Sequence, residues 1–348
     1  MAPVPTDPML LAMGDRRWTS FVAQHPEATP FHHPAWMELL ARTYGYPGFV
    51  IATAGQGGRI AAGAPFLEVR TVSRRRRWIS LPFTDECPLL ASGTGSRQQL
   101  IDALGAARQR FGAPGLQVRG PVDGLGWSTG ANAVIHELDL TPGLERVRER
   151  FSRSQVIRSI ARAEREGVVV RRGRGASDLE AFYRLHTSTR RRQGIPVQPR
   201  RFFELLWSRL VEPGLAFMLL ADTAAEETVA GALFLAGGGT TIYKFGASEP
   251  RSWPLRPNHL IFWSAIRDAC GRGDRRFDFG RTDLDNGGLR AFKSTWGAAE
   301  RPLRYSTLAA AGATPGLARR ALSTAIRRGP DWICRGAGAA LYRYAASR

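Results

Sequence analysis

The spacing of apolar residues over the first 140 positions predicts a mixture of strands and helices. Short apolar runs rich in β-branched and aromatic residues predict strands over 49–53, 60–69, 78–81, 116–119 and 133–140. Apolar residues at helical spacing predict helices over 34–44 and 98–111. Gly55, Gly57 and Gly58 mark one turn, and the arginine run 74–77 marks another. The first 30 residues are only weakly patterned.

The mixture continues beyond Pro142, a residue suited to the first turn of a helix. A long helix is predicted over 143–166, ending at Gly167. Further helices are predicted over 178–192, 199–210, 257–270 and 289–296, and strands over 168–171, 216–220, 228–236, 240–246 and 276–279. Helices and antiparallel meanders alternate without a regular βα order, so the pattern indicates an α+β fold.

The length of 348 residues indicates two domains, because single domains typically hold about 100–200 residues. We predict an N-terminal domain over 1–140, a second domain over 141–308 and a basic helical tail over 309–348. In the tail, Leu317, Leu322 and Ile326 alternate with arginine pairs at 319–320 and 327–328. Such a helix either docks on its own domain, the favoured interpretation, or lies on RNA or a membrane surface.

Charge narrows the class of partner. The formal net charge is +19, and the hydrophobic fraction of 43% is typical of a globular protein. Residues 148–192 contain 13 arginines against five acids, and residues 309–348 contain seven arginines against one acid. This surplus indicates an anionic partner: nucleic acid, a phosphorylated substrate or an acidic membrane surface.

Cysteine usage indicates the compartment. Cys87, Cys270 and Cys334 are scattered and form neither a disulfide framework nor a metal-binding spacing. We therefore expect a cytoplasmic protein, with peripheral contact at the inner membrane surface as an alternative. The first residues lack a signal-peptide pattern, and no apolar run reaches about 18 residues, so no transmembrane helix is expected.

Several catalytic signatures are missing from the sequence. There is no glycine-rich loop ending in Gly-Lys-Ser/Thr and no Gly-x-Ser-x-Gly motif. The six histidines lack metal spacing, so no metal site is expected. Residues 283–287 look like a calcium loop, but the twelfth position is Ser294 instead of glutamate. We predict Asn286 to be a turn or N-cap residue instead.

The two lysines are the most unusual feature of the composition. Of 49 basic residues only Lys244 and Lys293 are lysines, and each lies in an aromatic and glycine-rich motif. A compact ammonium differs from a guanidinium at a phosphate or a developing oxyanion. Adjacent strand residues face opposite sides. Lys244 therefore points away from any site that Tyr243 lines, and Lys293 is the stronger candidate.

The segment from Phe277 to Gly297 carries the strongest constellation of polar residues. We expect a strand to end at Phe279 and Arg281 to emerge just beyond it. A short helix then presents Lys293 beside Phe292 and Trp296, so that Arg281 and Lys293 converge on one anion. The alternative is that Arg281 forms an ion pair with a nearby aspartate in a structural turn.

From about Phe151 to Ser306 the chain resembles the FemAB-type transferases of the GNAT-like acyltransferase superfamily. The motifs that carry this resemblance are Ile160 to Gly167, Thr189 to Pro196, Tyr243 to Ser248, Leu255 to Leu260, Phe277 to Asp283 and Leu289 to Gly297. The first half resembles the family more weakly, through Phe31 to Trp36 and Ser80 to Asp85. The resemblance implies two GNAT-like mixed-sheet domains packed together, with substrate in a groove between them.

The resemblance also implies roles for individual residues. It implies that Lys293 stabilises the transferring carbonyl or a phosphate, and that Asp85 faces the incoming amine. It implies that Arg192 contacts an acceptor phosphate. From its place beyond the strand end, we expect Arg281 also to bind an anionic group of the acceptor. The remaining substrate-binding candidates are Tyr243, Trp36, Asn258 and Trp296. One departure is the glycine-free stretch 251–256, where GNAT enzymes that bind acyl-CoA have a glycine-containing phosphate loop.

The implied reaction forms an amide from an activated acyl group, without a bound cofactor. The preferred function is transfer of an aminoacyl group from aminoacyl-tRNA to an amine of a cell-wall precursor or small metabolite. One alternative is an acyl-CoA-dependent N-acyltransferase acting on a polysaccharide or lipid-linked sugar. The other is a non-catalytic RNA- or membrane-binding protein. Positioning of an activated donor needs little further catalytic apparatus.

Overall fold

The computed structural model describes residues 8–70, 76–113, 115–308 and 323–345. The predicted turn at 74–75 and the tail positions Leu317 and Leu322, with the arginine pair between them, lie outside the described residues. The chain forms two compact units. Unit 1 comprises Met1–Asn132, Pro302–Thr314 and Leu341–Arg348, and unit 2 comprises Ala133–Arg301 and Pro315–Ala340. The expected domain limits at residues 140 and 308 stay a prediction from the sequence.

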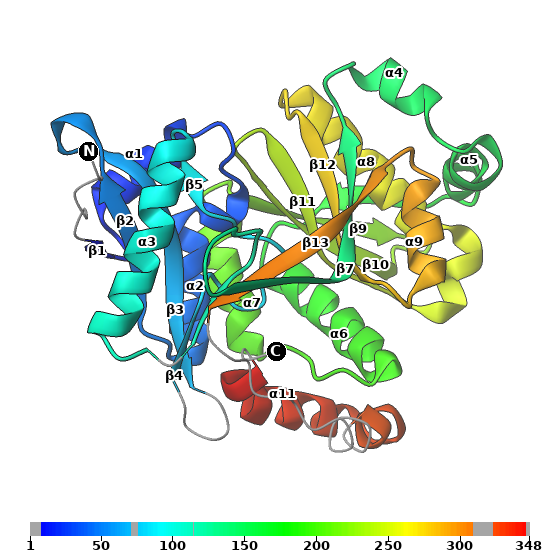
Figure 1. Ribbon diagram of the computed structural model, residues 1–348. Coiled ribbons are helices and arrows are strands. Elements are labelled where there is room, and N and C mark those ends of the chain that lie inside the picture. The colour runs from blue at the N-terminus through cyan, green and yellow to red at the C-terminus, as the bar shows by residue number, and fades with distance from the viewer. Residues whose placement is uncertain (1–7, 71–75, 114, 309–322, 346–348) are drawn as a thin grey trace. The chain divides into compact units, whose positions relative to one another are not determined.

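Unit 1 contains a mixed sheet with the strand order β1-β2-β3-β4-β6-β13. Its strands are β1 (Met9–Ala12), β2 (Gly48–Ala54), β3 (Ile60–Arg70), β4 (Arg76–Ile79), β5 (Leu90–Ala91) and β6 (Leu116–Val118). The last strand, β13 (Ala299–Leu308), joins through its second half. The β4–β6 pair is parallel and the remaining pairs are antiparallel. Its α-helices are α1 (Arg16–Gln24), α2 (Pro34–Tyr44) and α3 (Thr94–Arg110) (Figure 1).

The core of unit 1 forms between its sheet and α3. Apolar residues of α3, such as Leu100 and Leu104, share one buried cluster with Phe66 and Trp78 of the sheet. These helix positions are four apart and therefore lie on one face of α3. Burial of this face stabilises the unit, because apolar surface leaves water.

In unit 2 the strands of the mixed sheet follow the order β7-β12-β11-β10-β9-β8. Its strands are β7 (Trp127–Asp139), β8 (Val169–Arg172), β9 (Ala216–Asp222), β10 (Thr228–Gly237), β11 (Thr240–Ser248) and β12 (Arg276–Asp283). The β11–β12 pair is parallel, and the β7–β12, β10–β11, β9–β10 and β8–β9 pairs are antiparallel. The helices are α4 (Leu144–Glu149), α5 (Arg158–Arg165), α6 (Ala176–Gln193), α7 (Arg200–Leu206), α8 (Pro257–Gly271) and α9 (Gly287–Ser294) (Figure 1).

Helices α6 and α8 cover opposite faces of this sheet. Leu219 and Ala221 of β9 belong to the cluster that includes the apolar residues of α8. On the other face, Gly231 of β10 lies against the ring of Phe182 of α6. A Cβ atom added at position 231 would lie 3.0 Å from that ring. Since side chains alternate between the two faces of a strand, both faces of the sheet are buried. The predicted α+β class, with mixed-sheet strands in both units, is confirmed.

The single helix predicted over 143–166 is wrong. Helix α4 ends at Glu149, and Ser152 has a non-helical backbone whose N–H donates to Thr295 O at 2.8 Å. The Ser152 hydroxyl then accepts the N–H of Gln155 and caps the next segment, a π-helical turn that continues into α5. The apolar spacing runs through this break, because both helical pieces pack on the same core.

The weak patterning of the first 30 residues concealed β1 and α1. Strand β1 pairs with β2 from Met9 to Ala12, and Asp15 caps α1 by accepting the N–H of Arg17 at 2.9 Å. At the other end of the chain, residues 323–328 and α11 (Asp331–Ala345) are helical. Within the described ranges, no helix has the length and apolar character needed to cross a bilayer.

Candidate functional site

The two parallel strands of unit 2 diverge along their length. Three residue pairs join β11 to β12, ending at Ile242 and Asp278, although β11 continues to Ser248 and β12 to Asp283. Beyond Ile242 the facing edges no longer bond each other. Such edges can pair with an extended ligand as an added strand would. This divergence is therefore the candidate site.

A bulge bends β12 where the strands part. The pairing with β7 shifts between Asp278 and Arg281, and Gly280 has a φ of +73°, which favours glycine. The buried Asp278 carboxylate accepts the N–H of Gly280 at 2.7 Å. The strand expected to end at Phe279 thus continues past the bulge.

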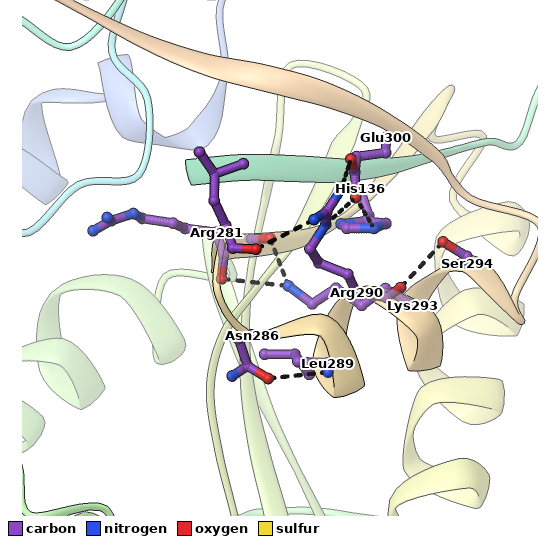
Figure 2. Close-up of polar contacts among 10 residues, drawn as sticks. His136, Arg281, Asn286, Leu289, Arg290, Lys293, Ser294 and Glu300 are labelled. Atoms are coloured by element: carbon purple, nitrogen blue, oxygen red, sulfur yellow. Dashed lines mark hydrogen bonds and ion pairs between the residues drawn. The ribbon is translucent and has the colours of Figure 1, made fainter. Parts of the chain in front are cut away.

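Lys293 of α9 holds this bulge from one side. Its Nζ donates to the carbonyl oxygens of Gly280 at 2.6 Å and Arg281 at 3.4 Å, and the residue is only 2% exposed (Figure 2). Charge-assisted hydrogen bonds of this kind are stronger than neutral ones. The ammonium therefore fixes the backbone at the divergence.

The guanidinium of Arg281 takes a different direction. It points away from Lys293 (Figure 2). The guanidinium forms an ion pair with Asp283, at 2.7 Å between Nη2 and Oδ1. The structural turn that we considered as the alternative for Arg281 is present. Convergence of the two side chains on one anion is not seen in this arrangement.

Helix α9 is fastened by its polar residues as well as by Lys293. Asn286 accepts the N–H of Leu289 at 3.1 Å, which confirms the predicted N-cap. Arg290 forms a two-point pair with Glu300 of β13, at 2.8 and 2.9 Å (Figure 2). These contacts fix the angle at which α9 presents Lys293.

His136 lies opposite the bulge and was not singled out by the sequence. It is fully buried, with Nε2 3.2 Å from Glu300 Oε2. Burial lowers the His136 pKa, the positive charge of Lys293 lowers it further, and Glu300 acts in the opposite direction. The imidazole is therefore neutral at neutral pH. A lone histidine in an apolar strand gives no sequence signal for such a position.

A second polar cluster surrounds Ser248 at the end of β11. Arg192 Nη2 donates to Ser248 O at 3.0 Å and to Thr189 Oγ1 at 3.2 Å. Ser248 Oγ accepts from Trp253 Nε1 at 3.0 Å and from Asn258 Nδ2 at 3.3 Å. The structure thus brings together two predicted substrate-binding residues, Arg192 and Asn258, and adds Trp253, which the sequence analysis missed.

Arg192 remains a cation in this cluster. Partial burial lowers its pKa, Arg191 lowers it further, and Glu249 opposes the shift. A guanidinium does not lose its proton in proteins, so the shift instead favours binding of an anion.

Tyr243 lines the divergence from β11. Its ring packs against Phe262 of α8 at 4.8 Å between centroids, and a Cβ atom at Gly246 would overlap its hydroxyl oxygen. Burial raises the Tyr243 pKa to about 12, with Arg190 opposing the shift. Tyr243 is thus a neutral hydroxyl that can donate or accept a hydrogen bond.

Trp296 lies in the core of unit 2 and has no exposed surface. Its ring contacts Phe151 and Phe262, and His259 stacks on it at 6.0 Å. Burial, followed by the charge of Arg256, lowers the His259 pKa to about 4. Trp296 therefore shapes the site from behind its lining residues.

Asp85 and Trp36 belong to unit 1. Asp85 is half-buried, and its backbone carbonyl accepts the hydroxyl of Tyr305 at 2.8 Å. Trp36 has no exposed surface, and its Nε1 donates to Thr84 Oγ1 at 2.7 Å. The expected role of Asp85 at the incoming amine stays a prediction. Over the described ranges, no three His, Cys, Asp or Glu residues are grouped to hold a metal ion.

Comparison with known proteins finds a family match over part of the chain. The acetyltransferase (GNAT) domain family matches residues 150–294, which include α5 through α9 and the diverging strands. A lipid II:glycine glycyltransferase of Staphylococcus aureus is 35% identical over 75 residues, 20% of this chain and 18% of that protein. The match thus spans less than a fifth of the glycyltransferase.

Solved structures share the fold over most of the chain. FemX aligns with a TM-score of 0.68 and 17% identity, over 86% of this chain and 96% of FemX. L-PGS from Bacillus licheniformis aligns at 0.56 and 12%, over 91% and 97% of the two chains. A tandem GNAT protein from the clavulanic acid biosynthesis pathway aligns at 0.52 and 13%, over 89% and 100%. The chain thus carries a GNAT-type segment over residues 150–294 and shares its fold with FemX over most of its length.

Proposed function

We propose that the protein is an amide-forming transferase that moves an aminoacyl group onto an amine of a cell-wall precursor. The observation that carries the proposal is the divergence of β11 and β12 beyond Ile242 and Asp278, within the GNAT-matching segment. An extended acyl donor that pairs with the diverging strand edges has its carbonyl held beside Tyr243. The short match to a lipid II:glycine glycyltransferase supports a cell-wall acceptor.

The residues around the divergence have separate roles in this proposal. Arg192, held by Ser248 and Thr189, binds an anionic group of the acceptor, because its guanidinium presents several donors in a fixed fork. The Tyr243 hydroxyl donates to the reacting carbonyl oxygen. Lys293 acts on the oxyanion through its positive charge and through the backbone that it fixes.

The proposed chemistry needs one group that accepts and returns a proton. The amine nitrogen forms a bond to the acyl carbon, the ester C–O bond breaks, and the leaving oxygen takes the electron pair. Asp85 of unit 1 accepts the proton that the amine loses, and the leaving oxygen takes up this proton and departs as a hydroxyl. An aminoacyl ester is already activated, so alignment supplies much of the rate.

The stretch after β11 supports aminoacyl-tRNA over acyl-CoA as the donor. Pro250 and Pro254 lie within a 3-10 helix there, and no glycine permits close approach of a pyrophosphate. Arg251 is neutralised by ion pairs with Glu227 and Glu249. The net charge of +19 suits an RNA backbone.

An acyl-CoA-dependent N-acyltransferase remains the second candidate, and one observation favours it. Helix α8 begins at Pro257 without a side-chain cap, since Arg256 occupies the N-cap position at a φ of +59°. Open N–H groups at a helix start bind phosphate oxygens, including those of CoA.

A direct assay tests the proposal. The purified protein is incubated with a mixture of charged tRNAs or with acyl-CoAs, together with nucleotide-linked and lipid-linked cell-wall precursors, and new amides are sought by mass spectrometry. We expect the wild-type protein to form amides from charged tRNA and the Arg192→Met variant to form none. Arg184→Met, a change at an exposed arginine of the same helix, serves as the matched control. Consumption of acyl-CoA alone selects the second candidate, and RNA or membrane binding without consumption of any donor refutes the transferase.

A further inference from the structure

Residues 80–88 of unit 1, here called the 80–88 loop, hold an unusual backbone. Leu81 and Phe83 both have a φ of +59°, and they are two of the four non-glycine residues with positive φ in the described ranges. A left-handed conformation brings the Cβ atom close to the following carbonyl, which disfavours bulky residues. Such strain persists only where the surroundings hold the chain, and it collects at functional sites.

The ends of the loop are tied together by Ser80 and Cys87. Ser80 Oγ donates to Cys87 O at 2.9 Å and accepts the N–H of Arg119 at 2.7 Å. The N–H of Cys87 donates to Arg119 O at 2.7 Å. Both Ser80 and Cys87 are fully buried, so these bonds are shielded from water.

Pro88, the last residue of the loop, is held from two directions. His32 Nδ1 accepts the N–H of Thr29 at 3.1 Å, so Nε2 carries the hydrogen and donates to Pro88 O at 3.0 Å. On the other side, a Cβ atom at Gly120 would lie 2.7 Å from Pro88 Cα. This contact is close enough to require glycine at position 120.

The middle of the loop is held by Trp36 and Tyr305. Trp36 donates to Thr84 Oγ1 at 2.7 Å, and Tyr305 donates to the carbonyl of Asp85 at 2.8 Å. The guanidinium of Arg119 stacks on the Tyr305 ring at 4.4 Å. Both hydrogen bonds hold the backbone at Asp85 or at the residue before it. The Asp85 side chain is half-buried and follows the buried Thr84.

We infer that Trp36 and Tyr305 are positioning residues that present the Asp85 carboxylate to the attacking amine. The inference rests on the proposed function, and it gives Trp36 a role different from the substrate contact expected from the sequence. A side chain with no exposed surface acts through the loop that it holds. A strained loop fixed at both ends and in the middle keeps the carboxylate in place before substrate arrives, which avoids reorganisation during the reaction.

A pair of variants at Thr84 tests the inference. Thr84→Val keeps the shape of the side chain and removes the acceptor for Trp36, whereas Thr84→Ser keeps the hydroxyl. We expect Thr84→Val to lower kcat about 10- to 100-fold with little change in the acceptor KM, because small misplacements of a reacting group have effects of this size. Thr84→Ser should retain kcat, and Tyr305→Phe should resemble Thr84→Val. Thermal unfolding of each variant separates loss of positioning from loss of the fold.

The outcomes separate the inference from the proposed function. An active wild-type protein whose Thr84→Val and Tyr305→Phe variants keep kcat overturns the role of the loop alone. A wild-type protein that forms no amide with any donor overturns the proposed function and the loop's role with it. An active protein that is insensitive to Asp85→Asn but sensitive to Glu86→Gln overturns the assignment of the presented carboxylate to Asp85.

Discussion

Replacement of Lys293 by methionine tests whether the buried ammonium fixes the bulge in β12. Methionine retains the apolar stem of the side chain and removes the donor to Gly280 O, at 2.6 Å, and to Arg281 O, at 3.4 Å. Loss of the short charge-assisted bond costs about 1.5–3 kcal/mol, and the stranded carbonyl adds to this. The variant no longer buries the Lys293 ammonium, and the desolvation cost that it avoids offsets part of the loss. We expect a net destabilisation of about 2–3 kcal/mol.

Thermal unfolding measures this loss directly. For a unit of this size, about 2–3 kcal/mol corresponds to a decrease in Tm of about 5–10 °C. Lys293→Arg should also be destabilised, because the bulkier, planar guanidinium does not fit the same buried position. Lys244→Met is the matched control, since Lys244 is half-buried and lies 5.8 Å from the Phe245 ring centre. A Tm for Lys293→Met within about 1 °C of wild type would refute the reasoning.

Three further predictions concern the site and its surroundings. Arg192→Lys should raise the acceptor KM about 10-fold or more with a smaller change in kcat, measured by steady-state kinetics, because an ammonium cannot reproduce the guanidinium fork. Gly246→Ala should destabilise the protein because its Cβ overlaps the Tyr243 hydroxyl, and Tyr243→Phe in the same chain should recover part of the loss in urea unfolding. Burial lowers the His186 pKa from 6.5 to about 3, so the unfolded state binds a proton first as pH falls from 6.5. Through this group, the free energy of unfolding should therefore fall by about 2.5 kcal/mol between pH 7.5 and pH 4.5. Urea titrations at the two pH values should not show this loss in the His186→Gln variant.

The local sequence was sufficient to predict a helix or strand and its limits wherever the apolar spacing agreed with the signals at the ends of the element. The helix predicted over 257–270 corresponds to α8, Pro257–Gly271, and the strand predicted over 228–236 corresponds to β10. Pro257 supplies a start signal and the glycine after Cys270 an end signal, so both limits could be read from the chain. The cap at Asn286 was predicted for the same reason.

The errors arose where a distant partner overrides local preference. The helix over 143–166 breaks at Ser152 because its N–H donates to Thr295, more than a hundred residues away. Strand β12 passes Gly280 because the carboxylate of Asp278 and the ammonium of Lys293 satisfy the bulge. Neither contact leaves a periodic signal in the sequence.

The features of the candidate site also divide into those that the sequence determined and those that the tertiary structure decided. The sequence alone determined which residue types were unusual: two lysines among 49 basic residues, and motifs that resemble a transferase family. Tertiary structure decided what each side chain does. It placed Lys293 on backbone carbonyls, paired Arg281 with Asp283, and buried Trp36 beneath the 80–88 loop. Residue type sets the chemistry available to a side chain, whereas burial and distant partners set which part of that chemistry is used.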